Sequence, residues 1–400
     1  MPFRSCISSS KPMSATQPYA RADKLLGAVM TALLLVGFWQ GMAALFSPEA
    51  LLRLKPALNP SAILAGHTAA TINYIMSHNL PADPLLRAAG GILRWRLFHS
   101  GGPQVGVGCN NWLYLTEELR PWPDAEAAMR QRADLVRRVA DKLESQAIRL
   151  RIVVVPDKAR VENGTLCGLR YAAQARERYA AFAALLHARG IVQVDLLQPF
   201  LAVHGRQPLY YRTDTHWNQD GAKLAAHLVA EVARIKSGDV IFRTEVADVP
   251  VERVGDLLRL MSLDIVTDWG GLGLRPAPDV EFMERTVPVE ASAAKGLLDE
   301  EPAAEVVLIG SSFSENANFH GRLQQELGIR ISRFARPGGG FAGAAREYLS
   351  SIAFRETPPK LVIWEFPERT LGQPLGNDEA KLFIETLPGY SGAFDSPVQN

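Results

Sequence analysis

Three side-chain types that can together activate a serine occur in this chain at Asp214, His216 and Ser312. The acid and the imidazole lie in the run DTHWN at 214–218, and the serine lies in GSSFS at 310–314. A serine hydroxyl is a weak nucleophile until a base takes its proton, and an imidazole oriented by a carboxylate can serve as that base. These types therefore predict transfer of an acyl group through an ester of the serine.

Asp214 and His216 are expected to share one face, because residues two apart in an extended segment point the same way. A helix is predicted to follow, with Asn218 as its N-cap. The apolar face of that helix consists of Ala222, Ala225, Leu228, Val229 and Val232. The positive end of its dipole favours a neutral imidazole, which a general base must be. Asp214 would then fix the tautomer of His216 so that the other ring nitrogen faces Ser312.

Two other interpretations of Asp214 and His216 stay open on these residues alone. The pair could be half of a metal site, or Asp214 could be an ordinary acid at the start of a helix. No other cluster of His, Cys or Asp in the sequence has recognisable ligand spacing, so we expect no metal.

Ser312 follows an apolar segment, 306–309, through Gly310, and a helical stretch is predicted to begin near Ser314. Functional groups gather at the carboxyl ends of strands in open α/β sheets. Backbone N–H groups at a helix start can also stabilise an oxyanion. The alternative is that the serines of 311–314 only supply turn and N-cap hydroxyls, which is the role we expect for Ser314.

Short apolar segments alternate with helical ones over most of the chain, which predicts an α/β fold with a parallel sheet covered on both faces. The predicted strands are 111–115, 150–155, 191–194, 306–309 and 361–364. The predicted helices are 124–147, 171–188 and 341–352. Residues 236–300 break the alternation and predict a β-rich insertion.

The composition is that of a globular chain with a sizeable core, because 47% of its 400 residues are hydrophobic. The formal net charge is +1. No basic excess indicates a nucleic-acid partner, so we expect none.

The run Leu25–Phe46 contains no charged residue. At about 1.5 Å per residue it is long enough to cross a bilayer core of about 30 Å. A cleaved signal peptide is the competing interpretation, but the run exceeds a usual signal-peptide core and no Ala-x-Ala site follows promptly. A buried core helix would show a polar face, which this run lacks. We therefore expect an uncleaved, single-pass anchor.

Basic residues precede this run and set its predicted orientation. They are Arg4, Lys11, Arg21 and Lys24, with Asp23 as the single acid of the predicted tail, residues 1–24. The tail should stay in the cytoplasm. The catalytic part would then lie outside it, in the periplasm at a bacterial inner membrane.

Two of the three cysteines, Cys109 and Cys167, fall in the part predicted to be exported, whereas Cys6 falls in the tail. An oxidising compartment permits a Cys109–Cys167 disulfide. Two separate buried thiols are equally compatible with the sequence, because the distance between the two Cα atoms cannot be read from it.

The runs at 214–218 and 310–314 together resemble the SGNH-hydrolase-like domain of the alginate O-acetyltransferase family, of the AlgJ and AlgX type. Supporting pieces occur in the same order at 111–115 (NWLYL), 155–158 (VPDK), 255–257 (GDL) and 364–369 (WEFPER). The resemblance covers about 105–372. It implies that Ser312 is the nucleophile, His216 the base and Asp214 the orienting acid, in the circularly permuted order of that family.

The resemblance leaves the oxyanion-binding and substrate-binding groups open. The candidates are Ser311, Trp217, Asn318 and Gly339, of which Asn318 and Gly339 could equally serve as a cap or in a turn. The predicted organisation is a cytoplasmic tail (1–24), a transmembrane anchor (25–46), a helical stalk or spacer (47–104), the acetyltransferase domain (105–372) and a loose C-terminal tail (373–400).

The activity that the resemblance implies is O-acetyl transfer to hydroxyls of an exported polysaccharide, alginate-like or cellulose-like, without a cofactor. A membrane-bound O-acyltransferase would deliver the acetyl donor. A polysaccharide acetyl esterase could use the same triad, since only the second acceptor differs. A third alternative is a non-catalytic component of an acetylation complex.

Overall fold

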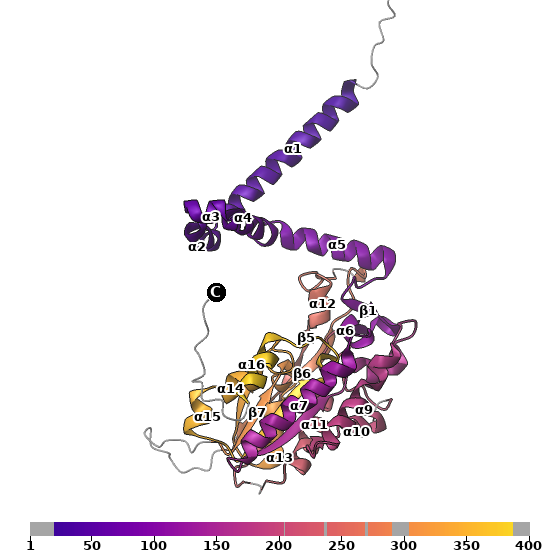
Figure 1. Cartoon of the computed structure of the whole chain (residues 1–400). Helices are drawn as coiled ribbons and strands as arrows, with labels where there is room; N and C mark the ends of the chain where they lie inside the picture. The colour runs from indigo at the N-terminus through magenta and orange to yellow at the C-terminus, as the bar shows by residue number, and fades with distance from the viewer. Residues whose placement is uncertain (1–19, 204, 236–237, 269–270, 290–303, 387–400) are drawn as a thin grey trace, which may run out of the picture. The chain divides into compact units, whose positions relative to one another are not determined.

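The computed structural model describes residues 20–203, 205–235, 238–268, 271–289 and 304–386 (Figure 1). The chain divides into two compact units, Met1–Ala89 and Gly90–Asn400. Parts of three predicted segments lie outside the described residues: the N-terminal tail up to residue 19, the end of the insertion from residue 290, and residues 387–400.

The first unit is helical. Its elements are α1 (Ala20–Leu45), α2 (Pro48–Leu54), η1 (Lys55–Ala57), α3 (Pro60–Leu64), α4 (His67–His78) and the start of α5 (Asp83–Phe98). Ser47 and Asn59 cap α2 and α3 with their side chains, and a proline occupies the first position of each helix. Within the predicted stalk or spacer, 47–104, the described elements are helical and end at Phe98.

Helix α1 covers the predicted anchor, although it begins earlier than Leu25, at Ala20. Its segment Arg21–Leu45 is long and apolar enough to cross a membrane, with a mean hydropathy of 1.8. The described residues therefore contain one candidate membrane-spanning helix, on length and composition.

The second unit is built on a five-stranded parallel sheet in the order β4-β3-β9-β7-β8. The strands are β3 (Arg149–Val155), β4 (Gln193–Val194), β7 (Val306–Gly310), β8 (Ile331–Ala335) and β9 (Leu361–Pro367). The last strand in the chain, β9, lies between β3 and β7, and it is buried along its whole length. The carboxyl ends of β3, β9 and β7 consequently meet at one edge.

Helices cover both faces of this sheet, as expected for a parallel sheet (Figure 1). One face packs against α7 (Ala125–Glu144), α9 (Ala173–His187), α14 (Gly343–Leu349) and α16 (Asn377–Glu385). The other packs against α10 (Leu197–Val203), α11 (Gln219–Ala233) and α13 (Phe319–Leu327). The remaining short helices are α6 (Thr116–Leu119), α8 (Lys158–Val161), α12 (Asp256–Leu260) and α15 (Ile352–Glu356).

Two antiparallel pairs lie outside the main sheet. Strands β1 (Val105–Val107) and β2 (Leu113–Leu115) form a hairpin around the single turn η2 (Cys109–Asn111). Strands β5 (Phe242–Arg253) and β6 (Asp279–Pro288) form a ribbon, with a register shift between Val246 and Pro250. The described part of 236–300, the predicted β-rich insertion, contains this ribbon and α12, which lies between its two strands in the chain.

The structure corrects four sequence-based expectations. Strand β8 was not predicted, and the helix predicted at 341–352 is divided into α14 and α15. Residues 373–386 are not a loose tail, because α16 buries Leu382 against the core and pairs Glu379 with Arg132 at 2.6 Å. No helix begins near Ser314: Ser312–Ser314 form a 3-10 turn (η5), and α13 starts at Phe319.

Candidate active site

Asp214, His216 and Ser312 form a continuous chain of hydrogen bonds. His216 Nδ1 lies 2.5 Å from Asp214 Oδ1, and His216 Nε2 lies 2.7 Å from Ser312 Oγ. An ionised carboxylate can only accept, so Nδ1 carries the proton and Nε2 of the neutral ring accepts from the Ser312 hydroxyl. The three residues that the sequence singled out are therefore in contact, although Ser312 is 96 positions away from His216.

The acid and the imidazole lie on a loop that doubles back on itself. Tyr210 and Trp217 form an antiparallel bridge, and Tyr211 N donates to His216 O at 3.2 Å. Asn218 then caps α11, accepting from Gly221 N at 3.0 Å, as predicted. This closure brings Asp214 and His216 to the tip of the loop, where both are at least 90% buried.

Side chains from the inserted segment hold the backbone of this loop in place. Asp279 accepts from the N–H groups of Arg212 and Thr213 at 2.8 and 2.9 Å. Asp256 accepts from Thr215 N at 2.8 Å and from Thr215 Oγ1 at 2.5 Å. A Cβ at Gly255 would lie 2.1 Å from Thr213 O, so only glycine permits this approach.

The charges around Asp214 keep its carboxyl ionised. Burial opposes ionisation, but the hydrogen bond and charge of His216, together with Arg253, outweigh it and hold the pKa of Asp214 below its ordinary value. Arg253 Nε lies 3.5 Å from Asp214 Oδ2. Asp214 is consequently an acceptor throughout the neutral range, as an acid that orients an imidazole must be.

Lys158 supports the loop from inside the protein. Its ammonium donates to Leu113 O, Arg212 O and Asp214 O at 2.6, 2.9 and 3.0 Å. It also lies 5.1 Å from the ring centroid of Trp112. Burial lowers the pKa of Lys158 to about 8, against the opposing effect of nearby acids of which Glu118 is the strongest.

This environment predicts a pH-dependent stability. The folded pKa of Lys158 is about 8 and its ordinary value is 10.5. Between these values the unfolded chain retains a proton that the folded chain has released, so a higher pH favours folding. Urea unfolding across this window should show a steeper rise in stability for the unaltered chain than for Lys158→Met. The exposed Lys223→Met is the matched control and should retain the original slope, whereas equal slopes for all three proteins would contradict the assignment.

The turn that carries Ser312 is held by a carboxyl group from the neighbouring strand. Glu365 of β9 accepts from Ser311 N, Ser311 Oγ and Ser314 Oγ at 2.8, 2.8 and 2.7 Å. Ser311, not Ser314, caps the 3-10 turn by accepting from Phe313 N at 3.2 Å. A Cβ at Gly310 would lie 2.6 Å from Glu365 Oε2 and closer still to Ser314 Oγ, so this contact also requires glycine.

Aromatic packing fixes the residue after Ser312. The Phe313 ring lies 4.8 Å from the His216 ring and 5.1 Å from Trp217, measured between centroids. Trp217 is completely buried and also packs against Phe319 at 4.9 Å. Trp217 was predicted as a possible substrate-binding residue, but its burial excludes direct contact with a substrate, and it acts as a support for Phe313.

The other predicted binding candidates have different surroundings. Both the N–H and the hydroxyl of Ser311 are bonded to Glu365, so Ser311 holds the turn. Gly339 N–H donates to Arg336 O at 2.9 Å. Asn318 donates to Thr286 Oγ1 at 2.9 Å and lines a hollow of about 330 Å³. Within the described part of the chain, the N–H of Ser312 itself has no acceptor.

The hollow that Asn318 lines begins beside the turn that carries Ser312. Asn316, another of its lining residues, donates to Ser312 O at 2.8 Å and accepts from Arg253 at 2.6 Å. Arg285 and Arg333 also line it, and neither has an acidic partner among the residues that the structure describes. Glu281, Glu284 and Glu315 line the same hollow, so its charges are of both signs.

A metal at this site has to be weighed, because Asp214, His216 and Asp256 place possible ligand atoms within 4.8 Å of one another. Asp214 Oδ1 already accepts from the N–H and the ring of His216. Both oxygens of Asp256 accept from Thr215. A cation would have to displace these donors, so the arrangement fits a hydrogen-bonded acid–base pair better than a metal centre.

A second group of buried charges joins the ends of β3 and β9 next to Lys158. Asp157 contacts Arg178, and Glu368 pairs with Arg160 at 2.5 Å. Asp157 N also donates to Glu368 at 3.0 Å. Burial and the charge of Glu368 raise the pKa of Asp157 well above its ordinary value. The sequence pieces 155–158 and 364–369 are thus brought together, as supports for the site.

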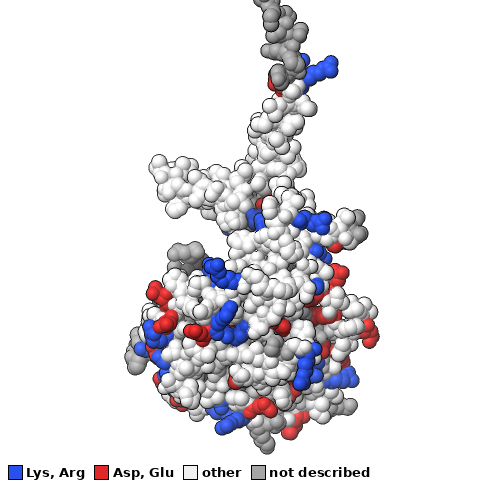
Figure 2. Space-filling view, turned by 90° about the vertical axis from the view of Figure 1, so that its right-hand side faces the viewer, with Lys and Arg blue, Asp and Glu red and all other residues white. Residues whose placement is uncertain are grey.

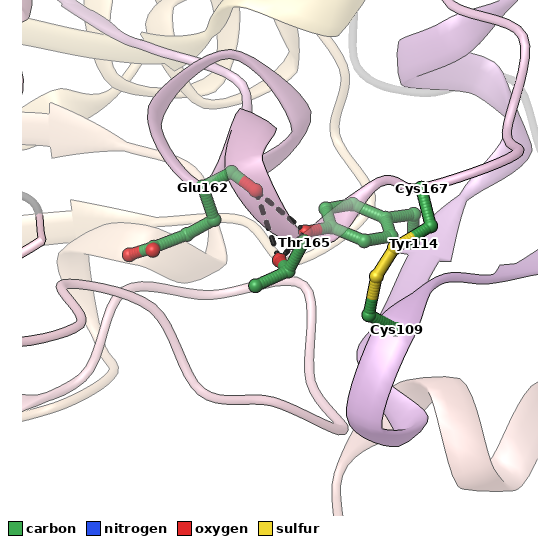
Figure 3. The surroundings of a disulfide bond; sticks show 5 residues. All are labelled: Cys109, Tyr114, Glu162, Thr165 and Cys167. Atoms are coloured by element: carbon green, nitrogen blue, oxygen red, sulfur yellow. Dashed lines mark hydrogen bonds between the residues drawn. A yellow bond between two sulfur atoms is a disulfide. The ribbon is translucent and has the colours of Figure 1, made fainter.

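A disulfide fastens the β1–β2 hairpin to the loop after α8 (Figure 3). It joins Cys109 to Cys167, whose Cα atoms are 5.7 Å apart. Beside it, the Tyr114 hydroxyl donates to Glu162 O at 2.8 Å and contacts Thr165 Oγ1. Because Leu113 of the hairpin contacts Lys158, the cross-link stabilises the same region that supports Asp214.

Replacement of both bridged cysteines by serine is expected to lower the free energy of unfolding by about 2–4 kcal/mol, because the cross-link restricts the unfolded chain. Urea unfolding of the full chain measures this loss. Cys6→Ser is the control for removal of a cysteine outside the bridge and should leave the midpoint unchanged. An unchanged midpoint for Cys109→Ser with Cys167→Ser would show that the bridge contributes nothing.

Charges of both signs are mixed on the side of the second unit that Figure 2 shows. Blue and red side chains are interspersed over the second unit there, without a broad area of one sign. In the same view α1 is white below its first charged residues.

Comparisons with known proteins place these features in context. A family model described as an SGNH hydrolase-like domain, acetyltransferase AlgX, matches residues 105–368. The probable alginate O-acetylase AlgJ of Pseudomonas putida is 35% identical over 71% of this chain and 74% of its own length. The corresponding protein of Pseudomonas aeruginosa is 33% identical over 72% of this chain and 74% of its own length.

Solved structures agree with these matches. The O-acetyltransferase domain of Pseudomonas putida AlgJ superposes with a TM-score of 0.61 at 32% identity, covering 71% of this chain and 99% of that domain. Pseudomonas aeruginosa AlgX shares the fold, with a TM-score of 0.53 at 22% identity over 72% of this chain and 67% of that chain. The predicted SGNH-hydrolase-like sheet flanked by helices is confirmed, while the circular permutation stays a prediction.

Proposed function

Because the chain belongs to the AlgX-type family of SGNH hydrolase-like acetyltransferases, we propose that it is a membrane-anchored enzyme that acetylates hydroxyl groups of an exported polysaccharide. The family resemblance predicted from 214–218 and 310–314 is confirmed by these matches. The observation that carries the proposed mechanism is the hydrogen-bonded chain from Asp214 through His216 to Ser312.

The first half of the reaction loads the enzyme. Ser312 Oγ attacks the acetyl carbonyl of the donor while His216 Nε2 takes the hydroxyl proton. The bond between the acetyl carbon and the donor's leaving oxygen or sulfur then breaks, and His216 returns the proton to that atom. The product is an acetyl ester of Ser312 with a neutral imidazole.

The second half transfers the acetyl group. A sugar hydroxyl gives its proton to His216 Nε2 and attacks the ester carbonyl. The bond to Ser312 Oγ breaks, and the proton returns to that oxygen. Asp214 accepts from Nδ1 in both halves and stabilises the imidazolium that forms. The N–H of Ser312, which has no acceptor among the described residues, is the proposed donor to the oxyanion of each tetrahedral intermediate.

The hollow lined by Asn316 and Asn318 is the proposed acceptor site. Relatives are named probable alginate O-acetylases, and alginate is a polymer whose sugars carry carboxylates. Arg285 and Arg333 have no acidic partner among the described residues and can pair with such groups. An acidic, alginate-like acceptor is therefore the one proposed, with these two arginines as its partners in a hollow that Glu281, Glu284 and Glu315 also line.

The proposed location follows from α1. With α1 as a single-pass anchor, the second unit works on the outer side of the inner membrane, in the periplasm. A disulfide between Cys109 and Cys167 suits that oxidising compartment. A membrane-bound O-acyltransferase is the proposed source of the acetyl donor.

The test is an assay of the full chain in detergent with an acetyl ester donor and alginate oligosaccharides. We expect O-acetylated oligosaccharide, and an acetylated Ser312 peptide by mass spectrometry when acceptor is omitted. Acetate release that does not respond to acceptor concentration would instead indicate an esterase. Failure of a fluorophosphonate to label the enzyme would favour a non-catalytic role.

A further inference from the structure

The helices after α1 expose an unusual number of large apolar side chains. Leu52 is 77% exposed and Leu64 is 89% exposed. Others exposed on α2–α5 within the first unit are Leu51, Leu58, Ile63, Ile72, Tyr74, Leu85 and Leu86. The core of this unit is small, consisting of Ala44, Ala50 and Ile75 with a few partly buried neighbours. Exposure of so many large apolar side chains on a few short helices is typical of a surface that contacts lipid or another molecule.

The same helices pack against the end of α1. Gln40 Oε1 accepts from Ala82 N at 2.9 Å, and a Cβ at Gly41 would lie 3.1 Å from the terminal methyl of Met76. Ala44 is fully buried by α2 and α4. In contrast, every described side chain of α1 from residue 21 to residue 39 is exposed.

The part of α1 that is uncharged and not covered by the other helices is too short to cross a bilayer. Residues 25–39 extend about 22 Å at 1.5 Å per residue, whereas the hydrocarbon core is about 30 Å thick. A spanning α1 must therefore also use residues 40–45 inside the membrane. The helices that pack on those residues are then held at the depth where headgroups meet acyl chains.

We propose that α2–α4 and the start of α5 lie in the outer membrane–water interface of the anchoring bilayer, with Leu51, Leu52, Ile63 and Leu64 among the side chains that enter the lipid. The partner of this surface is the lipid bilayer itself. This inference rests on the proposed anchoring by α1. It gives a location to the expected helical stalk or spacer at 47–104, for the part up to residue 89.

A hollow in the same unit suits a lipid headgroup. It has a volume of about 390 Å³ and is lined by Arg53, His67, Ala70, Thr71 and Tyr74. The Arg53 guanidinium lies 4.8 Å from the centroid of the Tyr74 ring, and Arg53 has no acidic partner among the described residues. A cation next to exposed leucines is the combination that interfacial helices use on anionic lipids.

Depth-dependent fluorescence quenching tests this placement. The full chain with Cys6→Ser and an intact Cys109–Cys167 bridge receives one new labelled cysteine, by Leu34→Cys, Leu52→Cys or Leu64→Cys. Each protein is reconstituted in nanodiscs of phosphatidylcholine and phosphatidylglycerol that contain nitroxide lipids. Ile352→Cys, at an exposed apolar position of the second unit, is the reference for an apolar site outside the first unit.

The label at residue 34 is expected to be quenched by nitroxides deep in the acyl chain, which reports the anchor. Labels at 52 and 64 are expected to be quenched about twofold or more by shallow nitroxides, relative to the label at 352. An unquenched label at residue 34 would overturn the anchor proposal. Quenching at residue 34 with none at 52 or 64 would overturn the interfacial placement alone, and would indicate that a protein covers this face.

Discussion

Replacement of Ser312 by alanine is expected to reduce acetyl transfer by about 10⁴-fold or more. The variant keeps the oxyanion donor and the acceptor hollow but cannot form the acetyl ester, so what remains is catalysis by binding and electrostatics alone. Initial rates of oligosaccharide acetylation by the full chain measure the loss. Ser312 is partly exposed and its hydroxyl donates only to His216 among the described contacts, so stability should change little.

Ser350→Ala is the matched control for Ser312→Ala, because Ser350 is the C-cap residue of α14 and its hydroxyl donates to Glu347 O at 3.1 Å, not to a residue of the proposed triad. It should keep the full transfer rate. Retention of transfer by Ser312→Ala, with the fold intact by circular dichroism, would eliminate the covalent mechanism.

Asp214→Asn is expected to reduce transfer by about 10³–10⁴-fold. The amide can offer its NH₂ group to His216 Nδ1, which favours the tautomer whose Nε2 carries the proton and cannot accept from Ser312. The carboxylate charge that stabilises the imidazolium is lost as well. The loss should appear in kcat more than in KM, because Asp214 is buried and does not contact the acceptor.

Asp256→Asn separates this effect from a general loss of negative charge. Asp256 Oδ2 lies 3.7 Å from His216 Nδ1, and its bonds go to the backbone and hydroxyl of Thr215. We expect a loss at least about tenfold smaller than that of Asp214→Asn. Equal losses for the two variants would show that Asp256 orients His216 as much as Asp214 does.

Asp214, His216 and Ser312 could be singled out from the sequence because each has a local signal. Asp214 and His216 are two positions apart before a capped helix, and Ser312 follows an apolar strand. The structure agrees with both local predictions, because Asn218 caps α11 and Ser312 lies two residues after the carboxyl end of β7. The sequence could not show that the two pieces touch, since that contact depends on the order of strands in the sheet.

The residues that hold the loop and the turn of the site in place had no comparable local signal in the sequence. Lys158, Asp256 and Glu365 were noted only as members of short runs that matched the family, without a role. Each acts across a long stretch of chain: Lys158 reaches Asp214 across 56 positions, and Glu365 reaches Ser311 across 54. From its local sequence, a lysine or glutamate is predicted to lie on the surface, because these residue types are rarely buried unless they are paired.

The elements that were missed have weak local patterns for a similar reason. Strand β8 (ISRFA) carries a serine and an exposed arginine at the edge of the sheet, so it lacks a continuous apolar run. Helix α16 depends on a pair between Glu379 and Arg132 that are 247 positions apart. Tertiary contacts, more than local propensity, stabilise both segments.

The loop that carries Asp214 and His216 has almost no secondary structure of its own, since carboxylates and an ammonium from three other segments occupy its backbone groups. Its shape is therefore set jointly by its own bridge between Tyr210 and Trp217 and by the distant side chains of Asp256, Asp279 and Lys158. A graft of residues 209–218 into another α/β protein would transfer the Asp214 and His216 side chains without the contacts that hold their conformation. A graft that keeps the positions of Asp214 and His216 must include the loop, the β5–β6 ribbon, α12 and the start of α8. A redesign of the substrate range should likewise leave these elements unchanged.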